Sequence, residues 1–164
     1  MYKAIEIAQY FLSKDSDNRV FNKDLITKNG RTFYSGNARL NKYLHLAQNL
    51  YIAKTGNKLF EDDLYAYDNG AVAVQVQENY SVLVGKKKDI NLPSDISDFL
   101  DRLYIALENA TLEELIEISH EDSEWEAKHS FYSKKDQKMD SLSRADEYKT
   151  QYKDMLTVLD RMEL

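Results

Sequence analysis

The feature that most constrains the fold is a run of apolar residues at helical spacing between Asn37 and Tyr51. These residues share one face of a helix: Leu40, Tyr43, Leu44, Ala47 and Tyr51. Leu46 and Leu50 widen this face, which predicts a helix that is covered on more than one side. The segment Thr55-Gly56-Asn57 ends the helix, because Gly and Asn tolerate the left-handed backbone that commonly closes one. We therefore expect a long central helix as the core of the fold.

A tight turn is predicted shortly after this helix. An apolar pair, Leu59-Phe60, is followed by the segment Leu64–Val72, which contains Asn69-Gly70. Asn-Gly is typical of a two-residue hairpin turn, because both residues accept a positive φ. Composition and spacing alone predict a helix, a turn and a short extended piece in this order.

The order and identity of these pieces resemble the Panacea domain, a family that includes phage-associated GepA proteins and the antitoxin SocA. The positions that match the family pattern are Lys42, Leu44, Ala47, Gln48, Gly56, Leu59, Phe60, Gly70, Val72 and Tyr80. Two positions depart from it, since Tyr67 stands where the family usually has Trp and Ala71 where it usually has Pro. The resemblance implies a mainly helical fold and an antitoxin function.

Composition limits the class of protein. A chain of 164 residues with 43% hydrophobic and 30% charged residues is long enough for one globular core. It has no cysteine, no apolar run of membrane-spanning length and no signal-peptide pattern, so we expect a cytoplasmic protein without disulfides. Residues 1–90 hold 13 basic and 10 acidic residues, and residues 91–164 hold 9 and 18. The acidic half suits a basic protein partner or is simply a solvated face, and it makes nucleic acid an unlikely partner.

The segments on either side of the central helix are less regular. Residues 2–12 have a helical apolar face, whereas residues 27–37 look like an inserted loop with Asn37 as the cap of the central helix. Residues 71–76 alternate like a strand, but the family resemblance assigns about 74–80 to a short helix, and we follow the family. Residues 81–84 are expected to form a short strand or an extended connection.

Two further helices are predicted after Pro93. The first has its apolar residues at helical spacing: Ile96, Phe99, Leu100, Leu103, Tyr104 and Leu107. The second begins at Thr111, which forms a capping box with Glu114. The pair predicts a helical hairpin. The fold class is therefore a mainly α, single-domain helical bundle with this hairpin and a small β-hairpin or short extended strands around residues 64–84.

A second match to the family follows this pair, where Ser119-His120 precedes Trp125. The resemblance then covers most of residues 2–130, which we take as a Panacea-like domain of residues 1–130. Residues 131–147 are strongly polar and are expected to be a linker or loop. Residues 148–164 carry a helical apolar stripe, so this last helix is expected to pack on the same domain or on a second subunit, which would make a homo-oligomer.

The chain offers little for catalysis. His120 and Glu124 share a helical face, and His129 is the only further imidazole nearby, so a metal-dependent hydrolase at His120 is a remote alternative to a histidine hydrogen bonded near a helix end. His45 is expected to be a packed or hydrogen-bonded structural residue. No phosphate-binding glycine loop and no Gly-x-Ser-x-Gly motif is present. We expect no catalytic residues, no metal and no cofactor.

The resemblance implies an antitoxin of a prophage or mobile element that binds and neutralises the toxin encoded beside it; some members also act as adaptors that hand the toxin to a host protease. The partner-binding residues expected from the family motifs are Lys42, Tyr65, Tyr67, Asp68, Asn69, Gly70, His120 and Trp125. For any one tyrosine, the alternative is that it covers the core with its hydroxyl at the surface. A second hypothesis is a phage accessory protein that binds DNA, or a host regulator, through Lys86, Lys87 and Lys88; three lysines in a loop are more often only solvated.

Overall fold

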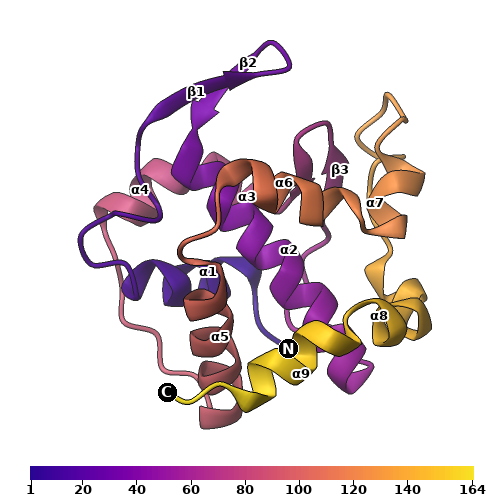
Figure 1. The fold of residues 1–164 in the computed structure, drawn as a ribbon. Helices are drawn as coiled ribbons and strands as arrows, with labels where there is room; N and C mark the ends of the chain where they lie inside the picture. Colours follow the sequence, from indigo (N-terminus) through magenta and orange to yellow (C-terminus); the bar gives the residue numbers. More distant parts are fainter.

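The computed structural model describes residues 1–164 and places one long helix, α2 (Ser35–Thr55), at the centre of a mainly helical fold (Figure 1). The other helices are α1 (Ala4–Ser13), α3 (Val74–Glu78), α4 (Tyr80–Gly85), α5 (Ser94–Leu107), α6 (Leu112–His120), α7 (Ser123–Lys128), η1 (Ser141–Arg144), α8 (Ala145–Gln151) and α9 (Lys153–Arg161). The strands are β1 (Leu25–Lys28), β2 (Arg31–Tyr34), β3 (Tyr65–Tyr67) and β4 (Gly70–Val72). The expected mainly α bundle with small hairpins is confirmed. No helix in it is long and apolar enough to cross a membrane.

Helix α2 is central because α1, α5, α6 and α8 all pack on it. Every residue from Leu40 to Leu50 is buried, so this part of the helix has no solvent face. It ends as predicted at Gly56, whose φ of +77° allows its N–H to bond the carbonyl of Ile52. The expectation that Asn37 caps the helix is wrong. The helix begins two residues earlier, and the Asn37 side chain bonds the carbonyl of Gln77 instead.

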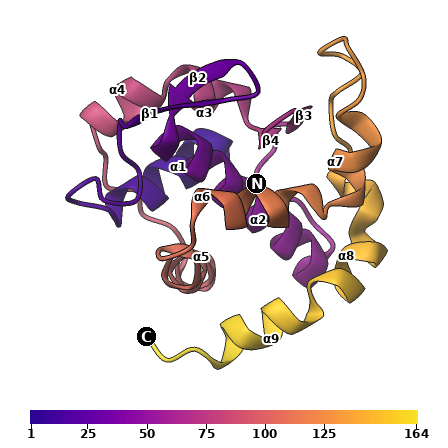
Figure 2. The same cartoon turned by 45° about the horizontal axis from the view of Figure 1, so that its top comes forward.

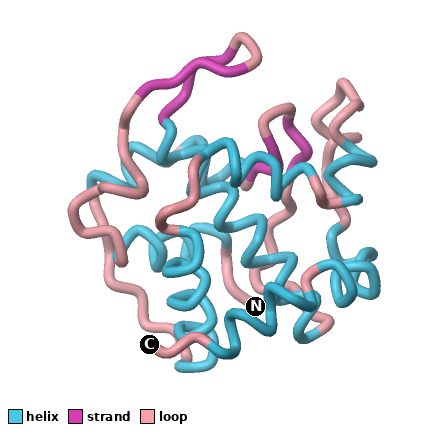
Figure 3. Tube along the Cα trace, in the orientation of Figure 1, coloured by secondary structure: helices cyan, strands magenta, loops and turns pink.

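The segment predicted as an inserted loop is in fact a β-hairpin. Strands β1 and β2 pair from Leu25 opposite Tyr34 to Lys28 opposite Arg31. The two turn residues, Asn29 and Gly30, have φ of +51° and +74°, which is the backbone that a two-residue turn between twisted strands requires. Strands β3 and β4 form the second hairpin, as expected, but its two turn residues are Asp68 and Asn69, because Gly70 already belongs to β4 and pairs with Tyr67. Figure 3 shows the two hairpins at the same end of the molecule.

The family resemblance assigned residues 74–80 correctly to a short helix, α3. The strand expected at residues 81–84 is wrong, because these residues belong to α4. The β-branched valines of residues 74–84 suggest a strand. However, Val76 is buried in α3, Leu83 and Val84 are buried in α4, and both helices pack on α1. Packing against a neighbouring element thus overrides the local β preference.

Helices α5 and α6 follow each other as predicted, with Pro93 before the first and a complete Thr111–Glu114 capping box at the second. They do not pack along each other as a helical hairpin would. Each packs on α2 instead, and Figure 2 shows α5 end-on while α6 runs across the view. Helix α6 therefore places its C-terminal end, Ser119 and His120, beside the β3–β4 turn.

The C-terminal part of the chain closes the other side of α2. The helix expected over residues 148–162 is divided at Tyr152 into α8, which packs on α2, and α9, which packs on α5. Part of the polar segment 131–147 is hydrogen bonded to β3 and the residue before it. The N–H of Ala66 bonds the carbonyl of Gln137, and the N–H of Met139 bonds the carbonyl of Leu64, so residues 137–139 run along β3.

Gly36 provides a test of how tightly the start of α2 is packed. A Cβ at this position would overlap the hydroxyl of Tyr80 and the backbone of Asn22, and that backbone is held by a hydrogen bond from the Tyr80 hydroxyl. We expect Gly36→Ala to lower the free energy of unfolding by about 1–3 kcal/mol, measured by urea denaturation. Gly85→Ala is the control, because its Cβ would meet nothing within 4 Å. Equal stability of the two variants would contradict this packing.

Candidate functional site

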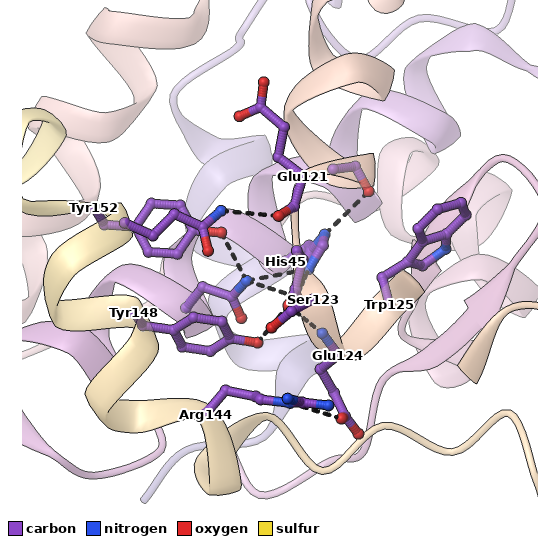
Figure 4. Close-up of polar contacts among 12 residues, drawn as sticks. His45, Glu121, Ser123, Glu124, Trp125, Arg144, Tyr148 and Tyr152 are labelled. Atoms are coloured by element: carbon purple, nitrogen blue, oxygen red, sulfur yellow. Dashed lines mark hydrogen bonds and ion pairs between the residues drawn. The ribbon is translucent and has the colours of Figure 1, made fainter. Parts of the chain in front are cut away.

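The functional region is built on a buried polar network between α2 and the loop after α6. His45 of α2 is 1% exposed, and its Nε2 lies 2.6 Å from a carboxylate oxygen of Asp122, which is fully buried. The other ring nitrogen of His45 lies 3.1 Å from the hydroxyl of Ser119. His45 is therefore the hydrogen-bonded structural residue that the sequence suggested. Figure 4 shows its ring between α6 and the C-terminal helices.

Asp122 is the hub of this network. One of its oxygens accepts from the Tyr148 hydroxyl at 2.7 Å and from the N–H of Glu124 at 2.9 Å, so Asp122 also caps the N-terminus of α7. The other oxygen accepts from the Asn49 side chain at 2.8 Å as well as facing His45. The amide nitrogen of Asn49 also lies 3.1 Å from the Tyr152 hydroxyl. Asp122 thereby joins α2, α7 and α8.

The hydrogen bonds to Asp122 decide its charge. Burial of the carboxylate would raise its pKa, but the hydrogen bond and charge interaction with His45 and the hydrogen bonds from Tyr148 and Asn49 together lower the pKa to about 2. Burial, and then the nearby carboxylate, raise the pKa of the Tyr148 phenol. The network therefore holds a carboxylate anion and neutral phenols at neutral pH.

The β3–β4 turn rests on the same part of α2. The Lys42 side chain is 2% exposed, and its ammonium donates to the carbonyl of Asn69 in the turn. Gly70 has a φ of +124°, and a Cβ there would lie 2.7 Å from the Lys42 Nζ and 2.8 Å from the Ser119 hydroxyl. Only glycine fits this backbone and this space. Burial lowers the pKa of Lys42 to about 8.

An aromatic stack holds the turn from its other side. The Trp125 ring lies between His120, at a centroid distance of 3.9 Å, and His129, at 4.2 Å, and both histidine rings are within 9° of parallel to it. The Trp125 Nε1 donates to the carbonyl of Tyr67 at 2.9 Å. Burial lowers the pKa of His120, whose buried Nε2 has no hydrogen-bond partner.

The structure brings together all eight residues that the family motifs suggested, around the β3–β4 turn. Four of them have solvent-exposed surface on the turn itself: Tyr65, Tyr67, Asp68 and Asn69. Lys42, Gly70 and Trp125 are buried beneath or beside the turn, and His120 is half-buried against Trp125. Lys86, Lys87 and Lys88 lie elsewhere, in the loop after α4.

The histidines and carboxylates do not converge as metal ligands. Trp125 separates His120 from His129, and Glu124 is engaged by the N–H of Asp140 at 2.6 Å and the Arg144 guanidinium at 3.2 Å. Nowhere in the fold do three or more His, Cys, Asp or Glu side chains gather in a way that would hold a metal ion.

Sequence reasoning missed the network around Asp122. Its residues are Asn49, Asp122, Tyr148 and Tyr152. Asp122 carried one local signal, because Asp is a favoured N-cap and Ser123 begins a short helix. The pairing of Asp122 with a residue 77 positions earlier has no signal in a single sequence.

With this geometry in place, the chain can be compared with known proteins. The model of the family described as "Antitoxin SocA-like, Panacea domain" matches residues 40–126, slightly more than half of the 164 residues. The match includes α2 from Leu40 onward, both strands of the β3–β4 hairpin, Asp122 and Trp125. The chain belongs to the SocA-like Panacea antitoxin family. No curated protein and no solved structure matches it.

Asp122 gives a test of the buried network. Its folded pKa of about 2 lies below the ordinary carboxyl value of 3.8, so its contribution to stability is present above about pH 4 and is lost as the pH falls through 2. We expect Asp122→Asn to lower the free energy of unfolding at pH 7 by about 3 kcal/mol and to remove roughly 2 kcal/mol of the acid-dependent loss. Urea unfolding between about pH 2 and pH 7 measures both changes.

The control is Asp160→Asn on the exposed side of α9, which we expect to leave stability within about 0.5 kcal/mol of the wild type. A pH profile of Asp122→Asn that runs parallel to the wild-type profile would contradict the assignment of Asp122 as the buried anion.

Proposed function

We propose that this protein is an antitoxin that neutralises a toxin by direct binding, and that the exposed β3–β4 turn is the centre of the binding surface. The observation that carries the proposal is the arrangement of the family-motif residues, which lie on this turn or support it from below. The family implies a cognate toxin as the partner and is generally non-catalytic. Binding alone is sufficient for neutralisation and uses no cofactor.

The turn has the surface chemistry of a binding patch. The Tyr65 and Tyr67 rings are half-buried and lie 6.5 Å apart, and Asp68 is exposed at the tip. Tyrosine supplies a large contact area with few rotatable bonds, so it loses little entropy when a partner binds. The Asn29 side chain donates to that of Asn69 at 2.7 Å, which links the β1–β2 hairpin to the same surface.

The buried members of the motif set the position of this patch. Lys42 holds the carbonyl of Asn69, and Trp125 holds the carbonyl of Tyr67, so the two ends of the turn are fixed from two helices. A turn held in one conformation binds with a smaller loss of conformational entropy. We assign Lys42, Gly70, His120 and Trp125 to this supporting role and the exposed turn residues to contact with the toxin.

The proposal extends to the context of the protein. Residues 1–130 would form the toxin-binding domain, with residues 148–164 packed on it through α8 and α9. The toxin gene would lie beside this one in a prophage or mobile element, and the complex would also present the toxin to a host protease.

The alternative function, DNA binding through the loop after α4, has weaker support. Lys86 and Lys88 are exposed, but the Lys87 ammonium donates to the carbonyl of Asp15 within the fold. Two free lysines on a chain of net charge −6 provide little attraction for a phosphate backbone. A gel mobility shift at low salt that Lys86→Gln/Lys88→Gln abolishes would favour this alternative.

The test of the proposed surface is the double variant Tyr65→Ala/Tyr67→Ala. It removes two partly exposed rings and leaves the backbone carbonyl that Trp125 bonds, so we expect an unchanged fold by circular dichroism. We expect toxin affinity to fall about 100-fold or more and growth rescue to be lost when toxin and variant are co-expressed.

The matched control removes two exposed apolar side chains from another face, Ile105→Ala in α5 and Val158→Ala in α9. It should neutralise the toxin like the wild type. A folded Tyr65→Ala/Tyr67→Ala variant that neutralises normally would contradict the proposed surface.

A further inference from the structure

A cavity of about 440 Å³ opens beside the β3–β4 turn. Its walls come from five segments: the β1–β2 hairpin, the first turns of α2, the β3–β4 hairpin, α3 and the loop after α7. Figures 1 and 2 show these hairpins and this loop projecting from the same side of the molecule. The aromatic side chains of the wall are Phe33, Tyr67 and Tyr132, the last of which is fully exposed.

The charge of this cavity is unbalanced. Three cations line it, Arg31, Lys42 and Lys134, against one carboxylate, Asp68. None of the three cations forms an ion pair within the chain: the ion pairs of the fold involve other basic residues. This is an unneutralised positive site on a protein whose net charge is −6.

A second cavity of the fold serves as a comparison, because two of its cations form ion pairs within the chain. It lies between β1 and the start of α6, and it is also lined by three cations, Arg19, Lys28 and Arg39. There, Arg19 pairs with Glu108 at 3.1 Å, Lys28 pairs with Glu113 at 3.0 Å, and Arg39 donates to the carbonyl of Ala110 at 2.7 Å. Two of the three cations of that cavity therefore pair with carboxylates, whereas none of the three beside the β3–β4 turn does: Lys42 meets the carbonyl of Asn69, and the Lys134 ammonium lies over the Tyr65 ring.

The burial of Lys42 makes this excess of positive charge energetically unfavourable. Its side chain is 2% exposed, yet its hydrogen-bond partner is one neutral carbonyl, that of Asn69. An ammonium has three N–H donors, and burying it without a counter-charge is unfavourable. An anion bound in the adjoining cavity would lower this cost through its charge, which acts over several ångströms in a poorly solvated site.

We propose that this cavity receives an acidic side chain, an Asp or Glu carboxylate, of the partner protein. The inference rests on the proposed function, because it names the chemistry by which the same surface recognises a toxin. Arg31 and Lys134 are exposed at the rim and contact the carboxylate, while Lys42 stabilises it from the wall. The aromatic rim packs against the apolar part of the acidic residue and its neighbours.

A protein carboxylate fits better than a nucleic-acid phosphate. The cations surround a single cavity and do not form a stripe that would follow a phosphate backbone, and the net charge of −6 of the whole chain would repel a polyanion. Inorganic phosphate is therefore included in the test as the competing ligand.

The first experiment needs no toxin. A capped peptide of four glutamates, a matching peptide of four glutamines and inorganic phosphate are each titrated into ¹⁵N-labelled protein and followed by NMR. We expect the glutamate peptide alone to shift the Arg31 side chain and the amides of residues 67–72. Arg31→Gln/Lys134→Gln should abolish the shifts, and Lys86→Gln/Lys88→Gln, which removes the same charge elsewhere, should keep them.

No shift at the cavity with the glutamate peptide, or equal shifts with the glutamine peptide, would overturn the proposal. Saturation by inorganic phosphate without a response to the glutamate peptide would overturn the carboxylate assignment in favour of a phosphate ligand.

The second experiment uses the toxin. We expect Arg31→Gln/Lys134→Gln to weaken toxin binding at least about tenfold in calorimetry, and the wild-type affinity to fall as salt is added. If this variant binds like the wild type while Tyr65→Ala/Tyr67→Ala does not, the cavity proposal fails and the proposed function stands. If the wild type binds no toxin, the proposed function fails, and the peptide titration still decides whether the cavity binds carboxylates.

Discussion

The structure depends on one buried contact, between the His45 imidazole and the Asp122 carboxylate. The two side chains are 2.6 Å apart and come from segments 77 positions apart in the chain. Around this pair, side chains of α2, the end of α6 and α8 complete a set of hydrogen bonds in which Asp122 accepts four, including the one that begins α7. Removing His45 would leave the buried Asp122 carboxylate with fewer hydrogen bonds, so the contact fixes how the C-terminal half closes over α2.

The candidate binding surface is a consequence of this closure. Ser119 bonds His45, and the same serine lies directly beneath Gly70 of the β3–β4 turn. Asp122 caps α7 by accepting the N–H of Glu124, and the next residue, Trp125, donates its ring N–H to the carbonyl of Tyr67. The buried anion and the exposed turn are therefore joined by short, direct contacts. Because this support already holds the turn in one conformation, the turn loses little conformational entropy when a partner binds its tyrosines.

The sequence predicted those features that depend on local pattern. The stripe from Leu40 to Tyr51, the Thr111 capping box and the hairpin near Asn69-Gly70 each have a signal within a few residues, and each was found, although the turn of this hairpin lies one residue earlier, at Asp68-Asn69. The β1–β2 hairpin was missed although Asn29-Gly30 is the same signal, because none of its strand residues is buried and the strands therefore lack a clear apolar face. The division of the last helix at Tyr152 and the His45–Asp122 contact could not be predicted from the sequence. Both involve contacts between distant segments, such as the Asn49–Tyr152 hydrogen bond. The motif residues were found through the family resemblance, and the cavity cations Arg31 and Lys134 were not, because they meet only in three dimensions.

The central claim is that a toxin binds the side of the molecule formed by the two hairpins and the loop after α7. Amide hydrogen exchange of the protein alone and in complex with a cognate toxin tests this claim most directly. The account predicts protection of residues 29–38, 65–72 and 131–137, with unchanged exchange in α5 and α9. Protection confined to α5 and α9, with the β3–β4 turn exchanging as in the free protein, would contradict it.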